Sequence, residues 1–218
     1  MTVDHRLAAS GLEALVALKS YVDGLPTKTQ WFKFLILGMV RALSREQLAF
    51  TESLNSSVPE QAWACRNVWE LDVFIAFALS RQENARRLFE DLWNDGDDLL
   101  LALHDYLALE GDTDVAAEFD RMRAQLSQGM TEHGVTRRRY TKTNQMAEET
   151  GLNDRFSRVN KLTSKFVHPT AFSILVDPGS EYESAMRSVL IEQSAAAVID
   201  ACDRLGKHLE VHGLEPAP

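Results

Sequence analysis

The sequence has few cysteines and no stretch that looks like a membrane segment. Only two of its 218 residues are cysteine, Cys65 and Cys202, and they stand far apart without a CxxC spacing. This argues against a disulfide scaffold or a zinc module and favours a reducing, cytoplasmic setting. The longest apolar stretch, residues 31–43, covers about 13 residues and includes two cations, too few for a bilayer span. Because no apolar leader opens the chain either, we expect no membrane segment.

Positive charge and the common catalytic motifs are also scarce. Lys and Arg number 23 against 32 Asp and Glu, and the net charge of −9 argues against a nucleic-acid binder that is basic overall. The chain has no GxxxxGK[ST], GxGxxG or GxSxG motif and no ExxH pair. The neighbours His104 and Asp105 lack the further ligands that a metal site needs. We therefore expect no cofactor and no metal, and the chain indicates no particular enzyme.

Strand signals are almost absent, whereas helix caps and apolar stripes at helical spacing recur along the chain. We expect an all-α fold: one domain, residues 1–218, forming a bundle of about eight helices, with a frayed tail at 210–218. Extended backbone is expected only at residues 171–176. The expected helices span residues 3–22, 30–54, 57–79, 82–93, 97–109, 113–127, 144–150, 153–167 and 180–209.

Several of these boundaries rest on particular residues. Ser57 with Glu60, and Ser180 with Glu183, have the spacing of capping boxes. The run 94–96 (Asn-Asp-Gly) predicts a break between two helices, and residues 129–142 are predicted to form a loop. Pro169 ends the helix before it, because proline disfavours a helical residue at the preceding position.

The segment 60–79 is apolar nearly all the way round, which predicts a helix surrounded by protein. Arg66 and Glu70 nevertheless fall on it, one helical turn apart, and a buried charge needs a partner. Two interpretations stay open: an internal ion pair that stabilises the bundle, or a polar site in a cavity lined by helices. The side chains expected in the core are Trp63, Trp69, Phe74 and Phe77.

Charge is unevenly distributed along the chain. Residues 90–120 contain eleven acids and neither Lys nor Arg, whereas residues 137–168 contain eight bases and three acids. One interpretation is mutual neutralisation of the two segments, within the chain or across a dimer. The other is an anion site on the basic segment. The run 137–142 (Arg-Arg-Arg-Tyr-Thr-Lys) is a further, weaker candidate for contact with nucleic acid.

The helix expected at residues 153–167 carries an ordered basic stripe. At 100° per residue, four cationic positions fall within an arc of about 80°, and apolar residues occupy the opposite side. Ser164 lies beside this arc, and His168 ends the helix, where the helix dipole favours its protonated form. The stripe either binds a phosphate or carboxylate, or only caps and solvates the helix. Its candidate ligand-binding residues are Arg158, Lys161, Ser164, Lys165 and His168, with Arg66 and Glu70 as the second part of the site.

Two stretches carry a resemblance to known proteins. The segment 160–171 (NKLTSKFVHPTA), downstream of Arg66-Asn-Val-Trp-Glu70, resembles a group of helical bacterial proteins of unknown function. That resemblance covers roughly half the chain and implies an all-α, soluble, bacterial protein. A looser similarity is to HEPN domains, helical nucleotide-binding or ribonuclease bundles whose signature is an Arg, then four to six residues, then a His. Here Lys161, not an Arg, lies seven residues before His168, and no Arg occupies positions 161 to 163, so the ribonuclease activity does not carry over.

Two classes of function follow. The first is an HEPN-like bundle that interacts with an anion, a nucleotide or RNA near Arg66, Glu70, Lys165 and His168. The second is a non-catalytic interaction or structural subunit in which these residues only stabilise the bundle. A shared pocket would favour the first class, and separate, satisfied faces would favour the second. The apolar surfaces of the helices at 30–54 and 180–209 also predict a homodimer.

Overall fold

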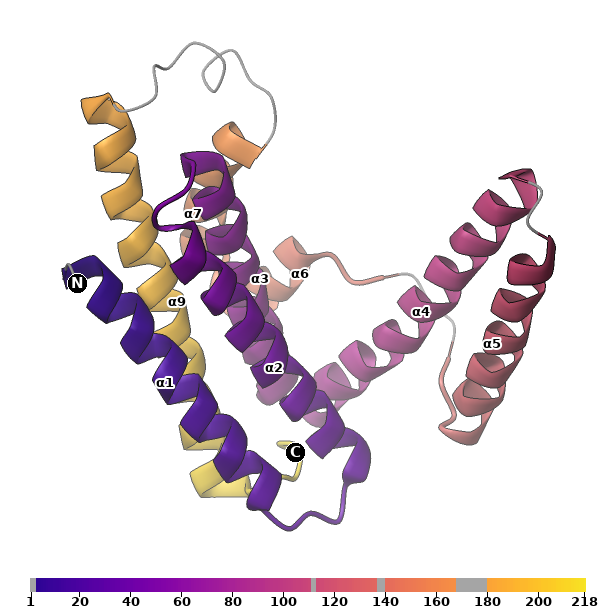
Figure 1. The fold of residues 1–218 in the computed structure, drawn as a ribbon. Helices are drawn as coiled ribbons and strands as arrows, with labels where there is room; N and C mark the ends of the chain where they lie inside the picture. Colours follow the sequence, from indigo (N-terminus) through magenta and orange to yellow (C-terminus); the bar gives the residue numbers. More distant parts are fainter. Residues whose placement is uncertain (1–2, 111–112, 137–139, 168–179) are drawn as a thin grey trace. The chain divides into compact units, whose positions relative to one another are not determined.

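The computed structural model describes residues 3–110, 113–136, 140–167 and 180–218, and these are helical almost throughout (Figure 1). Eight α-helices hold 86% of the described residues, and none of these residues lies in a β-strand. The expected all-α class is therefore confirmed. The extended segment expected at residues 171–176 lies outside the described residues.

The bounds of most helices lie close to those expected from the sequence. For α2, α3, α6 and α7 the difference is about one residue at each end. In chain order the helices are α1 (Val3–Gly24), α2 (Gln30–Ser53), α3 (Val58–Ser80), α4 (Gln82–Glu110), α5 (Thr113–Glu132), α6 (Thr143–Glu149), α7 (Asn153–Val167) and α9 (Glu181–His212).

The chain divides into two compact units, one of residues Met1–Ala85 with Lys142–Pro218 and one of residues Arg86–Thr141. The first unit holds α1, α2, α3, α6, α7 and α9. The second unit holds α5 and most of α4. That the whole chain folds as a single domain stays a prediction.

Helix α3 lies at the centre of the first unit, in contact with α2, α6, α7 and α9, while α1 packs on α2 and α9 (Figure 1). This arrangement explains why α3 is apolar over most of its circumference: most of its faces meet another helix. Its Trp69 and Phe77 are completely buried, together with Phe32 of α2, Phe156 of α7 and Leu205 of α9. The core of the unit is therefore built around α3.

The second unit is an antiparallel hairpin of α4 and α5, as contacts between the two helices show. Arg123 donates to Asp97 at 3.0 Å, and farther along the hairpin His104 lies 3.5 Å from Asp120. Gly129 leaves room for a tryptophan of α4, because a Cβ placed on it would come within 2.8 Å of the ring of Trp93. The small residue thus allows the two helices to approach closely near their open ends.

Two expected helix ends in this hairpin are wrong. Helix α4 continues through Asn94 and Gly96, where the sequence predicts a break, and α5 continues through Gly129 to Glu132. The Asn94 side chain donates back to the carbonyl of Glu90, one turn earlier, at 3.1 Å. Gly96 and Gly129 both pack against the partner helix, so the tertiary contacts outweigh the weak helix propensity of these residues.

The two expected capping boxes behave differently. Ser180 caps α9, and its hydroxyl accepts a hydrogen bond from the backbone N–H of Glu183 at 3.3 Å. Ser57 is the residue before α3, but its side chain makes no capping hydrogen bond, so the box with Glu60 is not formed. Proline in the first turn of α3 agrees with expectation.

The C-terminal residues are not frayed, which corrects the expectation for residues 210–218. Leu214 is buried, and its carbonyl accepts a hydrogen bond from the hydroxyl of Thr27 at 3.0 Å. Glu215 accepts from the backbone N–H of Lys28 at 2.9 Å and from the hydroxyl of Thr29. These bonds hold the pKa of Glu215 below its usual value. The loop between α1 and α2 thus fixes the end of the chain.

Candidate functional site

Helix α7 has the two-sided character expected from the sequence. Phe156, Val159 and Thr163 are buried against the bundle, whereas Arg158 and Lys161 are exposed. Neither of these cations makes an ion pair with any residue that the structure describes. The basic stripe therefore faces away from the core, and part of its charge is not neutralised within the described chain.

The other members of the stripe are placed less favourably for one common ligand. Lys165 is exposed and has an interaction of its own. Ser164 is half-buried, and its hydroxyl donates to the backbone carbonyl of Lys161 at 3.0 Å, one turn earlier. His168 lies outside the described residues. Ser164 thus satisfies the helix backbone and does not project a donor from the stripe.

Arg66 and Glu70 form an ion pair, as one of the two interpretations has it. The Nε of Arg66 lies 3.0 Å from the Oε1 of Glu70, and each side chain is 28% exposed. The expectation that these charges are buried is therefore wrong, because both reach solvent. The neighbouring Asn67 donates to Glu46 of α2 at 2.9 Å. The polar groups on this edge of α3 are thus satisfied by each other and by α2.

The four aromatic residues expected in the core of α3 divide into two groups. Trp69 and Phe77 are fully buried, and Phe74 is partly so. Trp63 is 55% exposed, so its assignment to the core is wrong. It lies on the same side of α3 as Arg66 and Glu70, the side that is partly open to solvent.

A cavity beside α2 and the start of α3 does not unite the candidate residues. It measures about 490 Å³ and lies between α2, the start of α3 and the last residue of α7, Val167. Its polar lining is acidic, from Glu46, Glu52 and Glu60, beside the exposed ring of Trp63. None of the candidate site residues that the structure describes lines this cavity: Arg66, Glu70, Arg158, Lys161, Ser164 and Lys165 all lie outside its lining.

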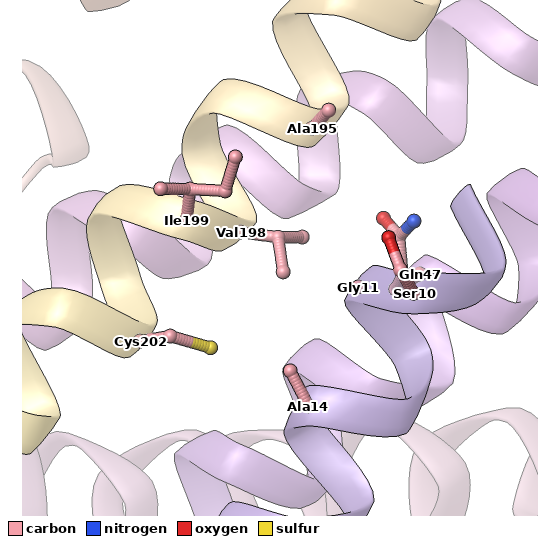
Figure 2. Close-up of a pocket in the computed structure, with 8 residues that line it drawn as sticks. All are labelled: Ser10, Gly11, Ala14, Gln47, Ala195, Val198, Ile199 and Cys202. Carbon is pink, nitrogen blue, oxygen red and sulfur yellow. The ribbon is translucent and has the colours of Figure 1, made fainter. Parts of the chain in front are cut away.

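A smaller cavity of about 200 Å³ lies between α1, α2 and α9 (Figure 2). Small residues of α1 face Val198 and Cys202 of α9 across it, with Gln47 of α2 at its edge. Burial raises the pKa of the Cys202 thiol, which disfavours the reactive thiolate. The lining is mostly apolar and contains none of the residues proposed from the sequence.

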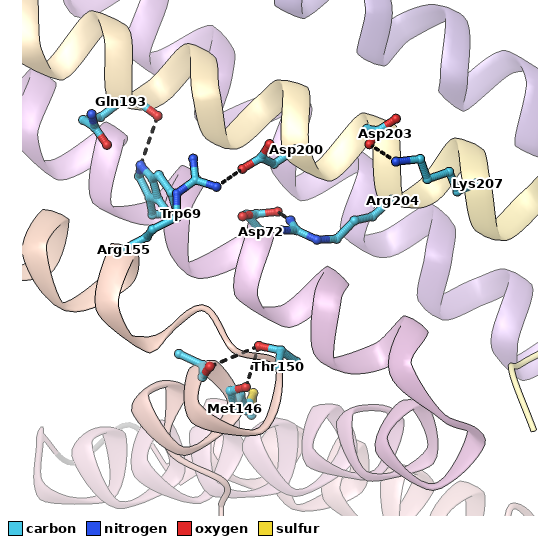
Figure 3. A network of polar contacts seen from close by, with 11 residues as sticks. Trp69, Asp72, Met146, Thr150, Arg155, Gln193, Asp200, Asp203, Arg204 and Lys207 are labelled. Carbon is cyan, nitrogen blue, oxygen red and sulfur yellow. Dashed lines mark hydrogen bonds and ion pairs between the residues drawn. The ribbon is translucent and has the colours of Figure 1, made fainter.

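A polar network that the sequence did not predict joins α3, α7 and α9, and it runs from the buried Asp72 to the partly exposed Arg155 (Figure 3). Asp72 of α3 is completely buried, and its Oδ1 accepts from Arg204 of α9 while its Oδ2 has no partner. Arg155 of α7 bonds Asp200 of α9 at 2.7 Å and lies over the ring of Trp69. Burial raises the pKa of Asp72 to about 6, against the opposing effect of Arg204.

This network is structural in character. Its charges are paired across three helices, and Trp69 adds a hydrogen bond to the carbonyl of Gln193 at 3.0 Å. A signal for it exists in the sequence, because Asp72 lies among apolar residues on the helix predicted to be buried. A charged residue on a buried helix needs a partner, and Asp72 is more deeply buried than Arg66 and Glu70.

The acidic segment 90–120 is neutralised in part by arginines of its own unit. Arg86 pairs with Glu90 at 2.9 Å, Arg123 pairs with Asp97, and Arg121 pairs with Glu118. Neutralisation of the α7 stripe by this segment stays a prediction. His104 lies 3.1 Å from Asp105, and the described residues contain no group of three side chains that could hold a metal ion.

Comparisons with known proteins leave the resemblance untested, since no family model, curated protein or solved structure matches the chain. The bacterial origin and the HEPN-like similarity therefore stay expectations. Among the helices that the structure describes, none has the length and apolar character needed to span a membrane.

Proposed function

We propose that the protein binds a chain of phosphates, such as single-stranded RNA, on the basic stripe of α7, and that it does so without catalysis. The observation that carries this proposal is the exposure of Arg158 and Lys161 on the outer face of α7, without a carboxylate partner among the described residues. Unneutralised cations in a row raise the local positive potential even in a protein of net charge −9.

The spacing of the stripe favours a chain of phosphates over a single one. With a rise of about 1.5 Å per residue, the positions of Arg158 and Lys165 lie about 10 Å apart along the helix. Side chains so far apart reach neighbouring phosphates of one strand more easily than one small anion. Within α7 the one carboxylate is Asp154, on the same side as the stripe and one turn before Arg158, at the start of the helix.

The proposal includes no catalysis because the residues of the second candidate group are already paired with each other. Arg66 and Glu70 satisfy each other on α3, which favours for them the alternative role of stabilising the bundle. The HEPN-like resemblance supports a helical protein that associates with RNA. The ribonuclease signature, however, requires an arginine before the histidine, and this chain has Lys161 there. Two free thiols, Cys65 and Cys202, fit the cytoplasmic setting of such a ligand.

The test is binding of a fluorescein-labelled single-stranded RNA of 12 nucleotides, measured by fluorescence anisotropy between 25 and 200 mM salt. For three phosphate contacts, log K should fall with log salt with a slope of about −2, since each contact on a single strand contributes about −0.7. The triple variant Arg158→Gln, Lys161→Gln, Lys165→Gln should lose at least ten-fold in affinity at the lowest salt.

The matched control removes three cations elsewhere in the first unit: Lys19→Gln, Arg45→Gln, Lys207→Gln. Each of these side chains pairs with a neighbouring carboxylate. Removing all three changes the net charge by the same amount as the triple variant and leaves the α7 stripe intact. The control variant should bind like the wild type. If both variants lose affinity equally, or the wild type does not bind at 25 mM salt, the proposal is wrong.

A further inference from the structure

The α4–α5 hairpin exposes apolar side chains on one continuous face. Leu99, Leu103 and Tyr106 of α4, with Val115 and Met122 of α5, are each between 36% and 61% exposed. The hydrogen bonds and ion pairs between the helices set Met122 level with Leu99 and Leu103, and Val115 level with Tyr106. We call these five residues the apolar face of the hairpin.

Helix geometry places all five on the same side of the hairpin. Around the axis of α4, the exposed apolar residues are offset by about 90° from the residues that pack on α5. The offset is opposite to the direction in which successive residues rotate around the helix. In α5 the exposed apolar residues are offset in the same sense, by about 70°, from the residues that pack on α4. Because the helices run antiparallel, these offsets turn both sets of side chains to one side. The residues therefore form a shared surface, not two separate stripes.

Carboxylates border the apolar face along both outer edges. Asp95 and Asp98 project from α4 on one edge, and Asp114 and Glu118 project from α5 on the other. Glu118 pairs with Arg121, but the other three make no ion pair with any described residue. Burial and the neighbouring Asp98 raise the pKa of Asp95, as expected where negative charges crowd together.

We propose that the apolar face of the hairpin docks an amphipathic helix of a partner protein whose polar face is rich in Lys and Arg. A helix lying along the hairpin would place apolar residues at i, i+3, i+4 and i+7 over the leucines, and its cations beside the acidic edges. Met122, flexible and polarisable, lets such a surface adapt to the side chains that it meets.

Charge complementarity selects this occupant over a second copy of the chain. Two hairpins packed face to face would bring their acidic edges together, and the residues 90–120 of each contain eleven acids and neither Lys nor Arg. Like charges placed opposite one another suppress association. A basic helix meets the same edges with attraction, and the apolar centre supplies the area to be buried.

The test uses a labelled 18-residue peptide of leucine and lysine, with leucine at helical spacing on one face, and the full-length protein. Binding is measured by fluorescence anisotropy, with a scrambled peptide of the same composition as a control for charge alone. The variant Leu99→Ser, Leu103→Ser should bind the amphipathic peptide at least ten-fold more weakly. So should Asp95→Asn, Asp98→Asn, which removes one acidic edge.

Matched variants separate the apolar face from general changes in the protein. Leu101→Ser removes an exposed leucine from another side of α4 and should bind like the wild type. Glu148→Gln, Glu210→Gln removes the same charge as the aspartate pair from exposed positions of the other unit and should also have no effect.

Three results would overturn the proposal. The first is equal binding of the scrambled peptide. The second is an equal loss of affinity in the matched variants. The third is a wild-type dimer in sedimentation that Leu99→Ser, Leu103→Ser converts to a monomer, because the face would then be occupied by a second copy. All the substituted residues are exposed, so each variant should retain the far-UV circular dichroism of the wild type.

Discussion

Replacing Arg204 by methionine should reveal the buried carboxyl of Asp72 as a stability change that depends on pH. Arg204 is 28% exposed and donates to Asp72, whose side chain has no exposure at all. The variant keeps much of the apolar stem of the arginine but removes its charge. The buried carboxyl then loses the counter-ion that partly opposes the rise of its pKa.

Protonation limits the cost of this loss, and the limit can be worked out. The folded pKa of Asp72 is about 6, so at pH 5 and below the carboxyl is largely protonated in the wild type as well. There the missing charge of Arg204 costs little. Above pH 6 the folded variant holds a proton that the folded wild type releases, which costs about 1.4 kcal/mol for each pH unit. For a carboxyl that stays protonated in the variant, the electrostatic loss reaches its limit of about 1.4 kcal/mol at pH 7 and about 2.7 kcal/mol at pH 8.

The sign follows from the direction of the shift. The pKa of Asp72 is raised above that of an unfolded aspartate, so the native state binds more protons, and stability falls as pH rises through the interval between the two values. In the wild type this decrease ends near pH 6. In Arg204→Met the folded pKa is higher still, so the decrease continues upward from pH 6.

The assay is urea unfolding followed by circular dichroism at 222 nm, at pH 5, 6, 7 and 8, for the wild type and Arg204→Met. Taking the difference between the two proteins cancels the titration of groups that behave alike in both. The same substitution in an Asp72→Asn background should show no dependence on pH. A constant difference from pH 5 to pH 8 in the Asp72 background would refute the reasoning.

The other predictions concern packing, the surface ion pair and association. Glu70→Ala should lower the free energy of unfolding in urea by about 1 kcal/mol or less, since the pair with Arg66 is partly exposed. Gly129→Ala should cost about 1–3 kcal/mol by the same measurement, because its Cβ would meet the ring of Trp93, whereas Gly38→Ala, with nothing within 4 Å, should stabilise by about 0.5–1 kcal/mol. The homodimer expected from the sequence should sediment as twice 24.5 kDa at tens of micromolar, and a monomer there would contradict it.

Local patterns in the sequence predict the helices of the first unit well. The two-sided character of α7 and the cap at Ser180 depend on residues close together in the chain, and the structure agrees with both. The breaks predicted in the second unit are wrong because Gly96 and Gly129 can be read in two ways. Glycine marks a helix end by propensity, but it also permits close approach of a partner helix, and only the tertiary contact decides between them.

The candidate site was harder to predict, because periodicity along a helix does not say where neighbouring helices end. Arg66 and Glu70 were correctly paired, yet their edge of α3 reaches solvent, as does Trp63. The apolar character of α3 therefore indicates that the helix packs among several others. It does not show which of its charged residues is the most buried.

Asp72 shows which rule would have served better. A short acidic side chain cannot extend to the surface as the longer chains of arginine and glutamate can, so on a helix surrounded by others it stays buried. Its partner must then come from another helix, and a long cationic side chain is the residue type that can reach it. Arg204, on the last helix of the chain, is such a residue, and its head remains partly exposed while it bonds Asp72. Asp72 also lies on the side of α3 opposite to Arg66 and Glu70, so the face on which a charge lies, and not its position in an i,i+4 pair, separates the interior ion pair from the one at the edge.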